Sequence, residues 1–136
     1  MTSILNIAVS GLNDAVTRIA NATTNIVNAS STSKNPGPGQ SYTGFQPQDV
    51  VTISTAAGGN AEGVTSALVP RSPAYTVQPA DAYTSYETGQ NTVAAPNVDL
   101  NSELIASKEA EISYGANAKV IKITEEMQQS LLDAVS

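Results

Sequence analysis

Carboxylates are the side chains of this sequence best suited to act in pairs as acid and base. Glu109 and Glu111 stand two residues apart, and Glu125 and Glu126 are adjacent. Paired-acid hydrolysis needs two carboxyl groups that converge on a cleft and have different pKa values. These four glutamates lie in a segment with the pattern of an exposed helix, and no cleft is indicated beside them. We therefore predict no catalytic pair here.

The residues for nucleophilic and metal chemistry are missing. The 136-residue chain has no cysteine and no histidine, which removes thiolates, disulfides and the commonest general base and metal ligand. Its many Ser and Thr residues therefore have no base to activate them. The glycine pairs at 37/39 and 58/59 do not continue into a nucleotide-binding fingerprint. We predict that the protein is not an enzyme, with no catalytic residue, no cofactor, no metal site and no small-molecule substrate.

Charge and hydropathy argue against two classes of partner. The formal charge is −6, and the six basic residues are dispersed along the chain. Because phosphate binding needs clustered Lys and Arg, we predict no nucleic-acid partner and no contact with a lipid bilayer. No apolar run approaches the ~20 residues of a membrane span, and the N-terminus lacks the basic region of a secretory signal. We expect any passage out of the cytoplasm to use a route without a cleaved signal.

Two long amphipathic helices are predicted, over residues 3–29 and 100–135. The apolar residues of the first alternate at spacings of three and four, which is an unbroken heptad seam: Leu5, Ala8, Leu12, Ala15, Ile19, Ala22, Ile26 and Ala29. The second has one apolar stripe, mostly at the same spacings: Ile105, Ile112, Ala116, Val120, Ile123, Met127, Leu131 and Ala134. Each stripe needs a partner. We predict that the helices pack on each other as an antiparallel coiled-coil pair, and on copies or relatives of the chain.

Polar residues support both helices. Asp14 stands four residues before Arg18, the favourable order for an ion pair within a helix. Asp99 or Asn101 is expected to cap the second helix, and Glu103 falls in its first turn, where negative charge is favoured. We interpret the other charges of the second helix as a solvated face.

The middle of the chain cannot continue either helix. Residues 35–97 hold all seven prolines and seven of the nine glycines. Residues 49–54 and 64–69 are β-prone and predict one hairpin across Gly58-Gly59-Asn60, with weaker strands at 74–77 and 91–94. Large apolar residues are few, so we expect a mobile or only partly folded insert. The predicted fold is mainly α with a small β insert, divided into 1–34, 35–97 and 98–136.

Two motifs resemble the terminal signatures of bacterial flagellar rod and hook proteins. They occur in the family's order, one near each end of the chain. The first comprises Ser10-Gly11-Leu12, Arg18-Ile19 and Asn25-Ile26-Val27-Asn28. The second comprises Pro96-Asn97-Val98-Asp99-Leu100, Glu103-Leu104, Tyr114-Gly115-Ala116-Asn117, Met127 and Leu131. The resemblance covers both helices well and the insert loosely. In its small size, its single short insert and the Asn-Val-Asp sequence before the second helix, the chain is most similar to the proximal rod members of the family.

The resemblance implies a structural subunit of the flagellar basal-body rod. Such proteins leave the cytoplasm unfolded through the flagellar type III export apparatus, without a cleaved signal. They polymerise with copies of themselves and with other rod proteins into the helical shaft that transmits torque across the periplasm. The alternatives are another rod or hook-family axial protein, an antiparallel coiled-coil adaptor unrelated to flagella, and a needle or tip component of a related export system.

Roles in helix packing or assembly are assigned to the apolar motif residues, either within one chain or between subunits. This set is Leu5, Leu12, Ile19, Ile26, Ile105, Ile112, Tyr114, Val120, Ile123, Met127 and Leu131. Gly11 is expected to allow a close helix crossing, with an export signal as the alternative. Asparagines 25, 28 and 117 are poor helix-interior residues, so they are expected to hydrogen-bond across a helix contact or to mark a bend. Tyr114 is expected to be half-buried.

Overall fold

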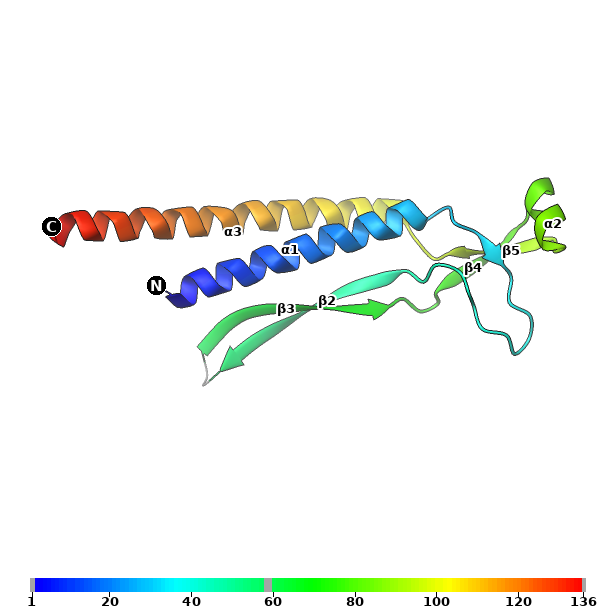
Figure 1. Cartoon of the computed structure of the whole chain (residues 1–136), viewed down its shortest axis with the longest axis horizontal. Helices are drawn as coiled ribbons and strands as arrows, with labels where there is room; N and C mark the ends of the chain where they lie inside the picture. The colour runs from blue at the N-terminus through cyan, green and yellow to red at the C-terminus, as the bar shows by residue number, and fades with distance from the viewer. Residues whose placement is uncertain (1, 58–59, 136) are drawn as a thin grey trace.

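A computed structural model describes residues 2–57 and 60–135. The chain enters through a long helix, crosses a β-rich middle and leaves through a longer helix (Figure 1). In order, the elements are α1 (Thr2–Asn28), β1 (Ser33–Lys34), β2 (Gln48–Ala57), β3 (Asn60–Pro70), β4 (Tyr75–Pro79), α2 (Ala82–Thr88), β5 (Thr92–Pro96) and α3 (Leu100–Val135). The two predicted terminal helices and the β region between them are confirmed.

The long helices lie side by side and run in opposite directions (Figure 1). Asn25 contacts Glu103, Arg18 contacts Glu109, and Gly11 lies against Asn117. Residue numbers fall along α1 as they rise along α3, which fixes the antiparallel direction. The coiled-coil form of this contact stays a prediction.

Small residues let α1 approach α3 closely. Ala8, Ala15 and Ala22, spaced seven apart on the predicted seam, are buried. A Cβ atom added to Gly11 would lie 2.6 Å from Nδ2 of Asn117, so the Asn117 side chain would have to move to admit a larger residue at this crossing. The alanines of the predicted seam are therefore buried in the single chain, and their place in a coiled coil stays a prediction.

The stripe predicted for α3 behaves differently. The buried residues of α3 are Glu103, Ala110 and Thr124, again at multiples of seven, whereas Ile112 and Ile123 are exposed. Helices this close together accept only small or polar side chains between them. The large aliphatic residues of α3 are therefore placed on its outer surface, and not against α1 as expected.

Strands β2 and β3 form the predicted antiparallel hairpin, whose Gly58-Gly59 turn lies outside the described residues. The hairpin packs along α1. Asp14 accepts hydrogen bonds of 2.7 Å from Thr52 and Ser66, an opposing pair in the hairpin, instead of pairing with Arg18. Gly63 lies so near Ser10 that a Cβ would collide with it. We expected a mobile or only partly folded insert. In the structure the hairpin is formed, and α1 provides the surface against which it packs.

The remaining strands form a small sheet in the order β1-β5-β4, with residues 93–96 of β5 buried at its centre. This agrees with the weaker strand predictions at 74–77 and 91–94. Tyr42 stacks on Tyr75 at a centroid distance of 4.5 Å and ties the loop before β2 to the sheet. Helix α2 projects from the end of the molecule opposite the chain termini (Figure 1).

Candidate assembly surface

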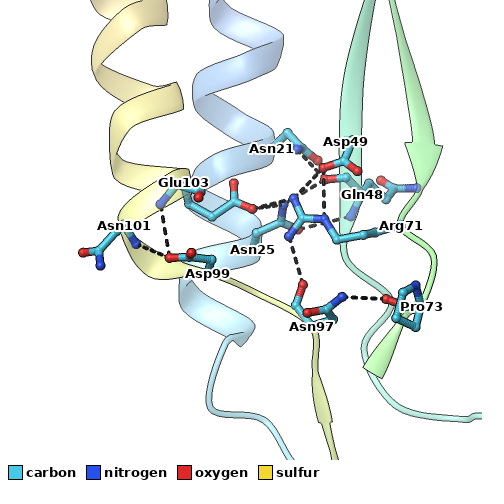
Figure 2. A network of polar contacts seen from close by, with 11 residues as sticks. Asn21, Asn25, Gln48, Asp49, Arg71, Pro73, Asn97, Asp99, Asn101 and Glu103 are labelled. Atoms are coloured by element: carbon cyan, nitrogen blue, oxygen red, sulfur yellow. Dashed lines mark hydrogen bonds and ion pairs between the residues drawn. The ribbon is translucent and has the colours of Figure 1, made fainter. Parts of the chain in front are cut away.

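A group of polar residues joins the hairpin to both long helices at the end of the molecule where α3 begins. We call this group the clasp. Figure 2 shows it converging from α1, β2, the residue after β3, the turn before α3 and α3 itself. Its members are Asn25, Gln48, Asp49, Arg71, Asn97 and Glu103.

Arg71 is the centre of the clasp. Its Nη1 donates to the carbonyl oxygen of Asn97 at 2.9 Å, and its Nη2 donates to Oε1 of Glu103 at 2.8 Å. Its Nε donates to Oδ1 of Asp49 at 3.0 Å, and Nη2 forms an ion pair with the same carboxylate. The planar fork of a guanidinium can reach several acceptors at once. One side chain thus links β2, the turn before α3 and α3.

Asn25 completes the clasp from α1. Its Nδ2 donates to Oε1 of Glu103 at 3.1 Å and to the carbonyl oxygen of Gln48 at 2.8 Å, while its Oδ1 accepts from the amide of Gln48 at 3.3 Å. Asn25 is 1% exposed and Glu103 is 4% exposed. A buried carboxylate is tolerated only when it is paired and hydrogen-bonded. Arg71 and Asn25 together meet that requirement.

The start of α3 is fixed beside the clasp. Oδ1 of Asp99 accepts from the amides of Asn101 and Ser102, at 2.9 and 3.3 Å, so Asp99 is the helix cap (Figure 2). The side chain of Asn97 donates to the carbonyl oxygen of Pro73 at 3.0 Å. The hydrogen bonds of Asp99 confirm it as the cap, the first of the two capping residues expected from the sequence.

The clasp is suited to holding segments together. The hydrogen bond to Asp49 raises the pKa of Arg71 above its ordinary value. Partial burial lowers this pKa, and the hydrogen bond to Glu103 raises it further. Arg71 therefore stays charged at any physiological pH.

Within residues 2–57 and 60–135, no three acidic side chains are grouped as a metal site would require, and no helix is both long and apolar enough to cross a membrane.

The apolar motif residues divide between the two helices. On α1, Leu5, Leu12, Ile19 and Ile26 are half-buried. On α3 each such residue is more than a third exposed, and this group is Ile105, Ile112, Tyr114, Val120, Ile123, Met127 and Leu131. These side chains of α3 are accessible to another molecule. Their role in assembly stays a prediction.

The polar motif residues of α1 mostly face other elements. Ser10 accepts a hydrogen bond from the amide of Val64 at 3.0 Å, and Arg18 forms an ion pair with Glu109 at 3.3 Å. Gly11 lies at the close helix crossing and Asn25 in the clasp. Asn28 instead donates to its own helix, at the carbonyl oxygen of Thr24.

The motif residues of the C-terminal half lie mainly near the start of α3. Asn97 and Asp99 fix the turn into the helix, and Val98 between them is half-buried. Asn117 packs against Gly11 and donates to the carbonyl oxygen of Ser113, while Ala116 is exposed. Asn25 thus bonds across the helix contact as expected, whereas Asn28 and Asn117 bond within their own helices.

The sequence alone does not identify Arg71 and Asp49 as members of the clasp. The sequence pattern places Arg71 among the dispersed basic residues and Asp49 at the start of a strand. The available signal was weak: Arg71 is a single charge between Pro70 and Pro73, directly after an apolar strand. A single arginine between prolines does not by itself predict a hydrogen-bonded turn, because its acceptors lie elsewhere in the sequence.

Most large apolar side chains of the molecule are exposed or only half-buried. Among the described residues no Leu, Ile, Met or Phe is buried, and the buried apolar residues are alanines and Val93 together with Pro47 and Pro96. The chain exposes 8844 Å², against about 6,700 Å² for a compact monomer of its mass of 14.0 kDa. The excess is comparable with the ~1,200–2,000 Å² buried by a specific protein interface.

Comparison with known families adds one match. Residues 89–134 match the family described as flagellar basal body rod FlgEFG protein C-terminal, which covers β5, the turn with Asn97 and Asp99, and almost all of α3. That family is a structural component of the flagellar rod and hook, and is not a family of enzymes. The match supports a flagellar basal-body rod protein without singling out one rod position. No curated protein matches the chain significantly.

Proposed function

We propose that the chain is a structural subunit of the flagellar basal-body rod, because residues 89–134 match a family of rod proteins. It polymerises with other axial proteins into the helical drive shaft that carries torque from the motor to the hook. The observation that carries this proposal is the absence of any buried Leu, Ile, Met or Phe among the described residues. A chain whose large aliphatic residues are exposed or only half-buried gains stability when copies or relatives cover them.

The arrangement of the exposed surface supports assembly through the helices. The stripe of α3 runs along almost the whole helix, and an exposed apolar face of this length is typical of a protein interface. The clasp holds the hairpin away from this stripe and fixes its position against α1. Each subunit would then present the same shape to its neighbours, which repeated heterologous contacts require.

The finer assignment rests on the sequence resemblance. Small size and a single short insert favour a proximal rod protein of the FlgC type. Rod proteins of this kind are exported by the flagellar type III apparatus without a cleaved signal and work in the periplasm. The absence of cysteine suits such a route, because no disulfide can obstruct the passage of the unfolded chain.

The alternatives differ in what the exposed stripe contacts. Another rod or hook-family axial protein would use it in the same way at a different position in the organelle. An antiparallel coiled-coil adaptor unrelated to flagella would use it for a soluble partner. A chain of that kind would be absent from purified basal bodies.

Replacing Ile123 with Asp tests the proposal. Ile123 is exposed, so the substitution should leave the fold of the single chain unchanged, but a charge in the subunit contact should prevent incorporation. The chain should still be exported, while cells carrying it as their only copy should not swim and their basal bodies should lack it. Gln129→Glu adds the same charge on another face of α3 and should support swimming. Normal motility of the Ile123→Asp cells would refute the assembly role of this stripe.

A further inference from the structure

We propose that the last turns of α3 are a docking site for a second copy of this chain, specifically for the first turns of its α1. The docking segment is residues 127–135, which we call the overhang. This inference rests on the proposed function and adds the identity of one contact within the polymer.

The overhang follows from the register of the two helices. Asn25 meets Glu103 and Gly11 meets Asn117, so each residue back along α1 corresponds to one residue forward along α3. Continued at the same spacing, Thr2 lies opposite residue 126. The nine residues beyond that point extend past the described part of α1 by about 14 Å, at 1.5 Å per residue. Figure 1 shows the end of α3 reaching beyond the start of α1.

The face of α3 that contacts α1 becomes apolar beyond the point where α1 ends. Beside α1 its residues are small or polar, as at Ala110 and Thr124. The same line continues seven residues later into Leu131, which lines a hollow with Gln128, Leu132 and Val135. The three apolar side chains of this hollow are 52, 64 and 84% exposed. The helix contact established within the chain thus continues into a large apolar surface that no described residue covers.

The first turns of α1 have the matching properties. Ile4 and Ile7 are 50 and 38% exposed, although they lie at the start of a helix whose other face is buried. Residues 2–13 carry no charged side chain, and the first turn of α1 has no acid to balance the positive end of its dipole. A segment of this kind can cover apolar surface without burying a charge.

Charge favours the same pairing. The last part of α3 carries Glu125, Glu126 and Asp133 against a single Lys122, and its last turn has no basic residue to balance the negative end of the helix dipole. The unbalanced positive end of α1 from a second copy would be attracted to this acidic end. Two overhangs paired with each other would instead bring acidic segments together.

Cysteine cross-linking tests the contact, because the natural chain has no cysteine to interfere. One full-length chain carries Gln128→Cys and a second, distinguishable by a tag, carries Ser3→Cys. Both positions border the proposed contact and leave its aliphatic residues intact. Mixed at high concentration and oxidised, the two chains should form a mixed disulfide. Gln129→Cys is the matched control: it makes the same exchange one residue along, about 100° around the helix.

The mixed disulfide should exceed the control by roughly tenfold, since a disulfide needs Cα atoms within about 7 Å. A disulfide only between two Gln128→Cys chains would overturn the proposal in favour of paired overhangs, and equal yields for positions 128 and 129 would overturn it altogether. Repeating the oxidation in purified basal bodies separates the two proposals. If the chain is present there but the mixed disulfide is absent, this contact is wrong and the rod function stands. If the disulfide forms in solution and basal bodies lack the chain, the contact stands and the rod function fails.

Discussion

The clasp and the overhang lie at opposite ends of α3 and use opposite kinds of residue. At the clasp, Asn25 and Glu103 are buried and hydrogen-bonded to one another and to the hairpin. At the overhang, Leu131 and Val135 are exposed. Beside α1 the helix buries small and polar side chains, and in its last turns it presents exposed aliphatic side chains.

The two kinds of contact have different physical consequences. Buried polar groups are stable only in one geometry, because each lost hydrogen bond leaves an unsatisfied group that costs about 1–3 kcal/mol. The clasp is therefore suited to fixing the position of the hairpin. Apolar burial is non-directional and scales with area, so it suits a contact that forms late and with several neighbours. Three variants test this division.

Replacing Arg71 with Ala should have the largest effect. It removes the partner of a carboxylate that is 4% exposed, and breaking a buried pair in this way costs about 3 kcal/mol or more. We expect the hairpin to separate from the helices, with faster hydrogen exchange of β2 and β3 amides, while α3 exchanges as before. Arg71→Lys keeps the charge but loses the fork, and should fall between the variant and the natural chain. Unchanged exchange in Arg71→Ala would mean that the clasp does not hold the hairpin.

Replacing Gly11 with Leu should have an intermediate effect. The added side chain meets Asn117 at the close helix crossing, and overpacking of this kind costs about 2 kcal/mol. Urea denaturation followed by circular dichroism should show the loss. A second substitution, Asn117→Ala, makes space and should recover part of the stability. A Gly11→Leu chain as stable as the natural one would show that the helices can separate at no cost.

Replacing Ile112 with Ser should have the smallest effect on the single chain. The side chain is exposed, and surface substitutions usually change stability by less than about 0.5 kcal/mol. Self-association measured by sedimentation should nevertheless weaken, because an apolar contact of the stripe is lost. A large drop in the stability of the monomer would contradict the division between the two kinds of contact.

The sequence predicts α1 better than α3 for a definite reason. In α1 the buried alanines lie on the same face as Leu12 and Ile19, so hydrophobic periodicity identifies the buried face. In α3 the buried residues include Glu103 and Thr124, and the periodic apolar residues lie elsewhere. Periodicity finds the most apolar face of a helix, and here that face is exposed in the single chain.

The hairpin and the helix cap could also be predicted from local patterns, because strands, glycine turns and capping residues are read within a few positions. The clasp could be predicted only in part. Asn25 is conspicuous as a polar residue on a helix interior, but nothing near Arg71 or Asp49 in the sequence reveals that they meet. Their pairing depends on how the hairpin lies against the helices, which is a tertiary property.

The clasp also sets an order of events for a chain that is made, or delivered, from its N-terminus onward. Its members are spread from Asn25 to Glu103, so α1 and the hairpin are complete before Glu103 arrives. Until then the hairpin can contact α1 through Asn25 and Gln48, but neither Asn25 nor Arg71 is joined to α3. The subunit therefore takes its final shape only after residue 103 has emerged.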